Sequence, residues 1–386
     1  MSSTSHLSGT AVSADSHSAP AQATDPSTPW HREREWVAGA IAVLRREAAR
    51  SADTHLLHMT FPGFAGIDFY FKDEAAHPTG SLKHRLARSL YLYALCNGRL
   101  RPGQAAVDAS SGSTAISEAW FARLLGLPFT AVMPDCTAPG KIAAVRALGA
   151  ACDMTPPGVC MQARAREIAA DGACFLDQFG LAERATDWRG NNNIAESIIE
   201  QLRGEPHPQP EWIVCGVGTG GTSATIGRYL RYLGLSTRLC VAEPRGMVFV
   251  QAWRKRDRGI RSACTSVIEG IGRSQVEPSF QFDVVDEAIE VDDAASVAAM
   301  MLLEEVLGFR YGGSSGTNFV ASVALAQRMR EAGERGSIVT LLCDRGVRYG
   351  QTLYDPEWLR SRAIDPAPWL AALRTALQTG SLQAPQ

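Results

Sequence analysis

Lys83 is the residue with the clearest chemical potential, because it follows a sharp break in the chain at Pro78-Thr79-Gly80. Ser81 is expected to cap the helix that starts beyond this break. The helical spacing is carried by Leu82, Leu86, Leu90 and Tyr93. The positive end of the helix dipole disfavours the ammonium form of a lysine in the first turn. A neutral amine can form a Schiff base with an aldehyde, although a solvated helix lysine would show the same local pattern.

A glycine-rich loop, Gly216-Val217-Gly218-Thr219-Gly220-Gly221-Thr222, connects a predicted strand at 212–215 to a predicted helix at 222–233. Its glycines let backbone amides approach an anion closely, and the start of the helix supplies unpaired N–H donors. The two threonines add hydroxyl donors. The loop therefore predicts a site for a phosphate group.

The same loop also fits a dinucleotide fingerprint. Gly216, Gly218 and Gly221 match G-x-G-x-x-G, and Glu243 ends the next predicted strand at about the spacing of an acid that binds a ribose. This interpretation predicts a nicotinamide-dependent dehydrogenase. It is weakened by the position of the motif, past the middle of the chain, and it leaves the other polar loops without a purpose.

Two further loops place hydroxyl groups before predicted helices. Ser110-Ser111-Gly112-Ser113-Thr114 follows a predicted strand, and hydroxyls and amides crowded at a helix start suit a carboxylate. Gly312-Gly313-Ser314-Ser315-Gly316-Thr317 repeats this pattern further along the chain. Each loop taken alone is also compatible with a well-capped helix or a simple turn.

The elements that position these loops alternate along the chain. We expect helices over 32–50, from Lys83, and over 113–125, 138–148, 161–170, 194–202, 222–233, 292–307 and 317–331. We expect strands over 67–72, 105–108, 129–133, 151–154, 173–176, 212–215, 238–242 and 337–342. This order predicts an α/β protein with parallel sheets, in which ligands collect at the carboxyl ends of the strands.

Composition narrows the class of protein. A length of 386 residues predicts two domains, and a net charge of -2 gives no electrostatic footprint for nucleic acid. Nine cysteines without a CxxC pair indicate reduced thiols in the cytoplasm rather than disulfides or a metal site. The sequence contains no run of eighteen apolar residues, so we expect no membrane span. Residues 1–29 contain no lysine or arginine and are expected to form a disordered tail.

Taken together, the motifs resemble those of the fold-type II pyridoxal-phosphate enzymes, the cysteine synthase and cystathionine β-synthase family. The similarity covers about residues 54–349, and five motifs keep the family's order. The resemblance implies that Lys83 holds pyridoxal 5'-phosphate as a Schiff base and then acts as the general base at Cα. It implies that the phosphate is bound by Gly218, Thr219, Gly220, Gly221 and Thr222. It also implies that Ser113 contacts the phenolic oxygen of the ring and that Ser314 contacts the pyridine nitrogen. It implies a substrate-carboxylate site made by Ser110, Ser111, Gly112, Thr114 and Gln178.

The family's pattern also shows departures. His77 and His84 stand where the family has Asn and Asp, and Ser113 replaces the Asn of the carboxylate loop. The motifs around Lys83 and Ser111, with the run Asn191-Asn192-Asn193, are more similar to bacterial L-cysteine desulfhydrases. That resemblance implies β-elimination on L-cysteine, which gives hydrogen sulfide, pyruvate and ammonia. The alternatives that stay open are β-replacement on O-acetylserine or a related activated serine, a dehydrogenase, and an idle cofactor-binding protein.

The resemblance further implies a fold-type II, tryptophan synthase β-like architecture. We expect a large cofactor-binding domain from 30–76 and 182–365, a smaller mobile substrate domain from 77–181, and a C-terminal tail at 366–386. It implies a cytoplasmic homodimer that acts on a small amino acid, without a metal, a nucleic acid or a membrane.

Overall fold

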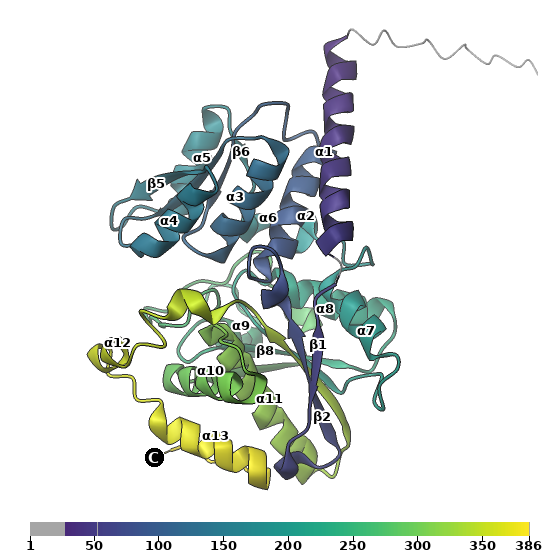
Figure 1. Ribbon diagram of the computed structural model, residues 1–386, viewed down its shortest axis with the longest axis vertical. Helices are drawn as coiled ribbons and strands as arrows, with labels where there is room; N and C mark the ends of the chain where they lie inside the picture. The colour runs from purple at the N-terminus through teal and green to yellow at the C-terminus, as the bar shows by residue number, and fades with distance from the viewer. Residues whose placement is uncertain (1–27, 52, 386) are drawn as a thin grey trace, which may run out of the picture.

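The computed structural model describes residues 28–51 and 53–385, and its strands form two separate sheets (Figure 1). The larger sheet has the order β1-β2-β10-β7-β8-β9, and its strands span Leu56–Met59, Ile67–Asp73, Gly336–Leu342, Trp212–Gly216, Arg238–Pro244 and Glu287–Val291. The smaller sheet has the order β5-β4-β3-β6, over Ala151–Thr155, Phe129–Pro134, Ala106–Ala109 and Cys174–Phe175. Every strand pair is parallel except β1 with β2, so the predicted α/β class with mostly parallel sheets is confirmed.

Helices cover the faces of both sheets. Their bounds are α1 Pro29–Ser51, α2 Lys83–Cys96, α3 Ser113–Leu125, α4 Pro139–Ala147, α5 Met161–Ala170, α6 Gln178–Ala185, α7 Ile194–Leu202, α8 Gly221–Tyr232, α9 Phe249–Lys255, α10 Asp293–Leu307, α11 Gly313–Glu331, α12 Pro356–Ser361 and α13 Ala367–Thr379. Short 3-10 turns lie at Pro62–Phe64, Glu74–Ala76, Phe282–Val284 and Gly346–Tyr349, the last of which is η4. The alternation of strands and helices produces the parallel pairing, because each crossover helix returns the chain to the same edge.

The larger sheet is buried on both faces. α10, α11 and α13 cover one face with residues such as Leu303, Phe319 and Leu373, while α7, α8 and α9 cover the other with residues such as Ile198 and Ile226. Strand β10 lies between β2 and β7 and is buried over its whole length. A strand covered on both faces is largely apolar, which explains Ile338, Val339, Leu341 and Leu342; Thr340 is the polar residue within this run.

The smaller sheet packs against α1, α2 and α3 on one face, and Val107 and Val132 pack against α5 on the other. Ala40 and Leu44 bury one side of α1 in this cluster. In Figure 1 the smaller sheet and its helices lie above the larger sheet, and α1 runs beside α2. The two halves therefore meet along one boundary, where the loops of interest lie.

The ends of the chain differ from the sequence expectation. The segment expected as a C-terminal tail forms α13, and Leu373, Ala376 and Leu377 are buried against the core of the larger half. The spacing of these apolar residues along the sequence is typical of a helix. The predicted N-terminal tail lies outside the described residues up to position 27, and Pro29 already begins α1.

Within the part of the chain that the structure describes, no helix has the length and apolarity needed to cross a membrane. No cluster of three or more His, Cys, Asp or Glu side chains in these residues has the geometry of a metal site. The nine cysteines are all free thiols.

Candidate active site

The segment before Lys83 is held by the end of strand β10. The Leu82 N–H donates to the Cys343 carbonyl at 2.8 Å, and the Arg345 N–H donates to the Gly80 carbonyl at 3.0 Å. Helix α2 then begins at Lys83 itself. The expected capping role of Ser81 is wrong, because its hydroxyl is buried without a partner in the described chain and only its carbonyl accepts the His84 N–H.

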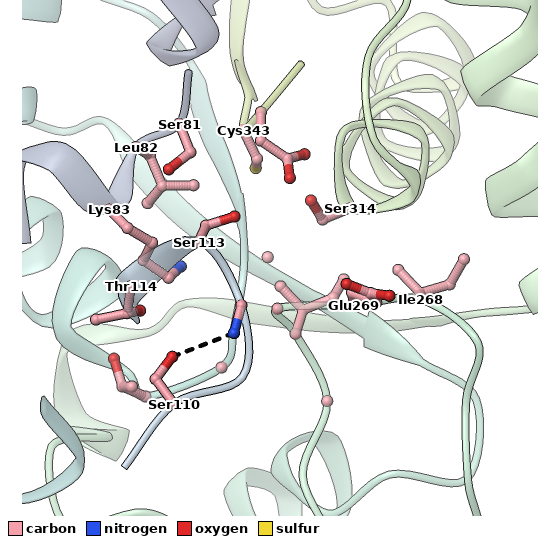
Figure 2. A pocket seen from close by; sticks show the side chains of 18 of the residues that line it. Ser81, Leu82, Lys83, Ser110, Ser113, Thr114, Ile268, Glu269, Ser314 and Cys343 are labelled. Atoms are coloured by element: carbon pink, nitrogen blue, oxygen red, sulfur yellow. Dashed lines mark hydrogen bonds between the residues drawn. The ribbon is translucent and has the colours of Figure 1, made fainter. Parts of the chain in front are cut away.

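The Lys83 side chain is half-buried and lines a cavity at the boundary of the two halves. Figure 2 shows it on the opposite side of the pocket from Ser314 and Glu269. Burial lowers the pKa of Lys83, and electrostatic interaction with the nearby Cys343 and Asp344 side chains offsets only part of this effect. The amine makes no hydrogen bond or ion pair with any other described residue. A neutral, unpaired amine is the form that attacks an aldehyde.

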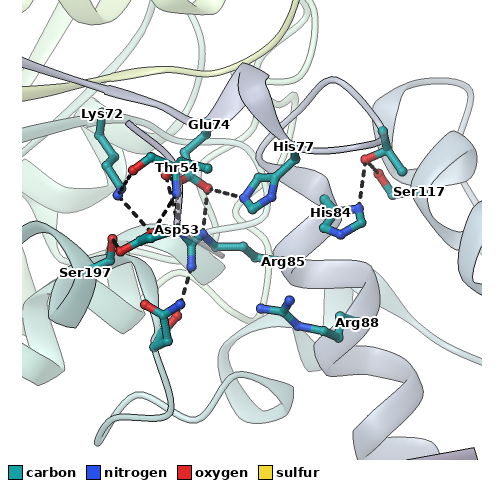
Figure 3. Close-up of polar contacts among 12 residues, drawn as sticks. Asp53, Thr54, Lys72, Glu74, His77, His84, Arg85, Arg88, Ser117 and Ser197 are labelled. Carbon is teal, nitrogen blue, oxygen red and sulfur yellow. Dashed lines mark hydrogen bonds and ion pairs between the residues drawn. The ribbon is translucent and has the colours of Figure 1, made fainter. Parts of the chain in front are cut away.

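Arg85 fixes the helix that carries Lys83 to the larger sheet (Figure 3). Its guanidinium donates to both Glu74 carboxylate oxygens at 2.7 and 3.0 Å, to Asp53 at 3.0 Å and to the Asn192 carbonyl at 2.8 Å. Glu74 is fully buried, and although burial raises its pKa, Arg85 and His77 bring the pKa well below its usual range. This charged cluster holds the first turn of α2 in place.

His84 joins three helices through a buried chain of hydrogen bonds. Its Nε2 contacts Glu47 of α1 at 3.0 Å, its Nδ1 contacts the Thr79 hydroxyl at 3.2 Å, and Thr79 contacts Ser117 of α3 at 2.9 Å. Burial raises the pKa of Glu47, but hydrogen bonds from His84 and Ser51 lower it to about 2 overall. The Glu47 carboxylate therefore accepts from Nε2–H, and Nδ1 accepts from Thr79. His84 replaces the family's Asp in a structural role.

The His84 contacts predict a pH-dependent stability. Burial lowers the pKa of folded His84 below 6.5, so the unfolded chain binds more protons as the pH falls through 6.5. The stability that His84 contributes is therefore present above that pH and is lost below it. His84→Gln is expected to lower the free energy of unfolding at pH 7 by about 1–3 kcal/mol, through lost buried hydrogen bonds. Its free energy of unfolding should also decline less steeply between pH 7 and pH 5, measured by denaturant unfolding.

The matched control for this prediction is His31→Gln, because His31 lies in the first turn of α1 and its side chain makes no hydrogen bond or ion pair with another described residue. A surface substitution is expected to change the free energy of unfolding by less than about 0.5 kcal/mol. An unchanged stability of His84→Gln at pH 7 would contradict the structural role.

The glycine loop after β7 lies against other backbone segments. Gly220 has a φ of +90°, and a Cβ there would lie 2.5–2.6 Å from the Phe280 backbone. A Cβ at Gly218 would collide with the Gly270 carbonyl. Helix α8 begins at Gly221, so the first N–H groups of α8 have no intrahelical acceptor. The loop therefore offers donors at close approach, as an anion site requires.

Glu243 does not contribute to a ligand site at the glycine loop. Its carboxylate is fully buried and accepts the backbone N–H groups of Phe249 and Val250, at 3.0 and 2.6 Å. Burial raises the pKa of Glu243 to about 7, despite these two hydrogen bonds. The carboxylate thus caps α9, and the interpretation of Glu243 as a ribose-binding acid is wrong.

The hydroxyl loop after β3 is organised by its first serine. The Ser110 Oγ accepts the N–H groups of Gly112 and Ala115, at 3.4 and 3.2 Å. Beside it, Gln178 begins α6, and its side-chain amide donates to the Ala109 carbonyl at 2.8 Å. This bond leaves the second N–H of the Gln178 side-chain amide for a ligand.

Sequence reasoning missed Arg348. From η4 in the larger half it donates to the Ser113 hydroxyl at 2.7 Å, across the boundary between the halves. The two residues lie 235 positions apart, so no local pattern signals their contact. Arg348 orients the serine that stands in place of the family's Asn.

Asp344 was also missed, although its position at the carboxyl end of β10 is a signal for a site residue. Its Oδ2 accepts from the Tyr349 hydroxyl at 2.7 Å, while its Oδ1 is buried without a partner in the described chain. Burial raises the pKa of Asp344. Ser314 lies nearby in the first turn of α11, which begins four residues earlier than expected.

One cavity of about 390 Å³ brings the predicted residues together. It is lined by Lys83, Ser110, Ser111, Gly112, Ser113, Thr114, Gln178, Gly218, Thr219, Gly220, Thr222 and Ser314. Gly221 instead lines a smaller cavity of about 80 Å³, which shares Lys83 and Thr222 with the first. A half-buried amine with a lowered pKa, a glycine loop with free N–H donors and a hydroxyl loop around one cavity fit an aromatic aldehyde that carries a phosphate.

Comparison with known proteins agrees with this geometry. Residues 52–344 match the model of the pyridoxal-phosphate dependent enzymes. The chain is 52% identical over 345 residues to an L-cysteine desulfhydrase, Cds1, of Mycobacterium tuberculosis, covering 88% of this chain and 94% of that protein. It is 28% identical to cysteine synthase 1 of Neurospora crassa, over 78% of this chain and 80% of that protein. The crystal structure of O-ureido-L-serine synthase is similar with a TM-score of 0.71 and 25% identity, over 81% of this chain and 95% of that chain.

Proposed function

Because the chain belongs to the family of pyridoxal-phosphate dependent enzymes, we propose that it is an L-cysteine desulfhydrase, which eliminates hydrogen sulfide from L-cysteine. The remaining three-carbon product, 2-aminoacrylate, takes up water to give pyruvate and ammonia. The observation that carries this proposal is the half-buried Lys83 amine, which has no partner among the described residues and shares one cavity with the glycine loop and the hydroxyl loop. The choice of cysteine is supported by the 52% identity to a cysteine desulfhydrase.

We assign the cofactor contacts residue by residue. Lys83 binds the aldehyde carbon, the loop Gly218 to Thr222 binds the phosphate, Ser314 faces the ring nitrogen and Ser113 the phenolic oxygen. When bound, pyridoxal phosphate supplies an electron sink for the pair of electrons left at Cα. A hydroxyl such as Ser314 does not force the ring nitrogen to carry a proton.

The substrate is held by its carboxylate. We assign this role to the hydroxyls and amides of Ser110, Ser111, Gly112 and Thr114, together with the second N–H of the Gln178 side-chain amide. The Lys83 amine lines the same cavity as the hydroxyl loop, so when it is not attached to the cofactor it would accept the Cα proton of a substrate held there. The low pKa of this amine keeps a fraction of it neutral and able to accept that proton.

The organisation of the enzyme follows the same proposal. The domain bounds expected from the sequence change at both ends. Residues 182–365, the strands β1 and β2 and helix α13 form the large domain, because α13 packs against its core. Residues 77–181 together with α1, which packs against the smaller sheet, form a smaller domain whose closure would exclude water from the site. We further infer a homodimer in the cytoplasm, supported by the family resemblance and by nine free thiols, which suit a reducing compartment. Size-exclusion chromatography with light scattering tests the dimer.

Product analysis tests the reaction. Purified protein with pyridoxal phosphate and cysteine alone is expected to release sulfide and pyruvate in equal amounts. The alternative is β-replacement on O-acetylserine, which the similarity to cysteine synthase 1 supports, so O-acetylserine with sulfide is the parallel assay. Cysteine formed faster from O-acetylserine than sulfide from cysteine would reverse the assignment.

A further inference from the structure

An ion pair crosses the cavity between the two halves of the molecule. The Lys141 Nζ lies 2.6 Å from the Glu269 Oε1, and both side chains line the cavity that contains Lys83. Among the described residues it is the one ion pair with both partners in that lining. Neither residue belongs to the proposed cofactor or carboxylate contacts.

The two partners are anchored to different sheets. Lys141 lies in α4, which packs against α3 and β5 of the smaller half. Glu269 lies in the loop that precedes Gly270, and the Gly272 N–H donates to the Val217 carbonyl in the larger half at 2.8 Å. The pair thus links the two walls of the cavity, as does the Arg348 bond to Ser113. Opening the cavity between the halves requires that this pair separate.

The pair lies near solvent. The Lys141 and Glu269 side chains are 24% and 39% exposed, which places them at the mouth of the cavity rather than at its base. Exposed pairs of this kind contribute little to the stability of a fold. The Lys141–Glu269 pair is therefore of interest for its position at the cavity mouth rather than for its contribution to the stability of the fold.

We propose that the Lys141–Glu269 pair controls the fate of 2-aminoacrylate, and this inference rests on the proposed function. Two outcomes compete once sulfide has left. Water converts 2-aminoacrylate to pyruvate and ammonia, or a thiol adds its sulfur to Cβ and its proton to Cα, which gives an S-substituted cysteine. A thiol needs a wider entrance than a water molecule. By keeping the mouth closed, the pair favours hydrolysis over replacement.

Partitioning with a neutral thiol tests the inference. The holoenzyme is supplied with cysteine and 2-mercaptoethanol, and the ratio of S-(2-hydroxyethyl)cysteine to pyruvate is measured by mass spectrometry. Lys141→Ala and Glu269→Gln are each expected to raise this ratio by about threefold, the effect of losing an exposed ion pair of ordinary strength. A neutral thiol is used because it forms no charge contact of its own with either residue.

Two variants control the measurement. Glu305→Gln breaks an exposed pair with Arg374 far from the cavity and should leave the ratio unchanged. The double variant Lys141→Glu with Glu269→Lys rebuilds the pair in reverse and should restore the ratio of the unsubstituted enzyme. An unchanged or lower ratio in single variants that still release sulfide overturns the inference, and so does a swap that fails to restore it. Absence of sulfide from the unsubstituted enzyme would instead refute the proposed function, and the inference with it.

Discussion

Replacing Lys83 with alanine is expected to reduce sulfide release from cysteine by about 10³-fold or more. General-base catalysis alone contributes on the order of 10²–10⁴-fold, and Lys83→Ala removes both this base and the covalent attachment of the cofactor. The unsubstituted protein should be yellow after purification, because the Schiff base absorbs visible light. The variant should lose this absorption band, and both effects are measured on the same preparation with a sulfide assay and a spectrum.

The control for Lys83→Ala is Lys255→Ala, because Lys255 is an exposed lysine at the end of α9. It should retain full activity and colour. Thermal unfolding of both variants shows whether a loss of activity comes from the missing amine or from an unfolded protein. A folded Lys83→Ala protein with unchanged turnover would refute the assigned role of this residue.

Gly220→Ala is expected to have the second-largest effect. The φ of +90° costs an alanine about 1–2 kcal/mol, and displacing the Phe280 backbone adds about 1–3 kcal/mol. Because the loop must shift to relieve the collision, the affinity for pyridoxal phosphate should fall about tenfold or more, equivalent to about 1.4 kcal/mol. Titration of the apoenzyme with the cofactor, followed by absorbance, measures this loss.

Gly234→Ala is the matched control for backbone strain. Gly234 has a φ of +66°, and a Cβ there would meet nothing within 4 Å. It should lower the stability through strain alone and leave cofactor affinity unchanged. Equal losses of affinity in the two variants would contradict a specific role for the Gly220 loop.

Sequence patterns predicted the parts of the site that lie in one loop each. The glycine loop and the two hydroxyl loops could be found because residue types, strands and helix starts occur together within six or seven positions. The helices at 113–125, 161–170 and 194–202 were predicted to the residue, since their apolar spacing is strong.

Contacts between distant segments could not be predicted in the same way. Arg348 reaches Ser113, and Lys141 reaches Glu269, only because the two halves pack together. Glu243 matched the spacing of a ribose-binding acid, yet its environment makes it a helix cap. Ser81 has the residue type of an N-cap, but pairing of its segment with the end of β10 overrides that preference.

The position of β10 between β2 and β7 has a consequence during biosynthesis. Its residues emerge from the ribosome after most of the polypeptide, and until then the segment that aims Lys83 lacks the strand it pairs with. At about 5–20 residues per second, the last central strand follows strand β6 by roughly 10–30 s. The segment that positions Lys83 therefore stays without its partner strand until synthesis has passed residue 343, and a nascent chain that ends before that residue lacks an assembled site.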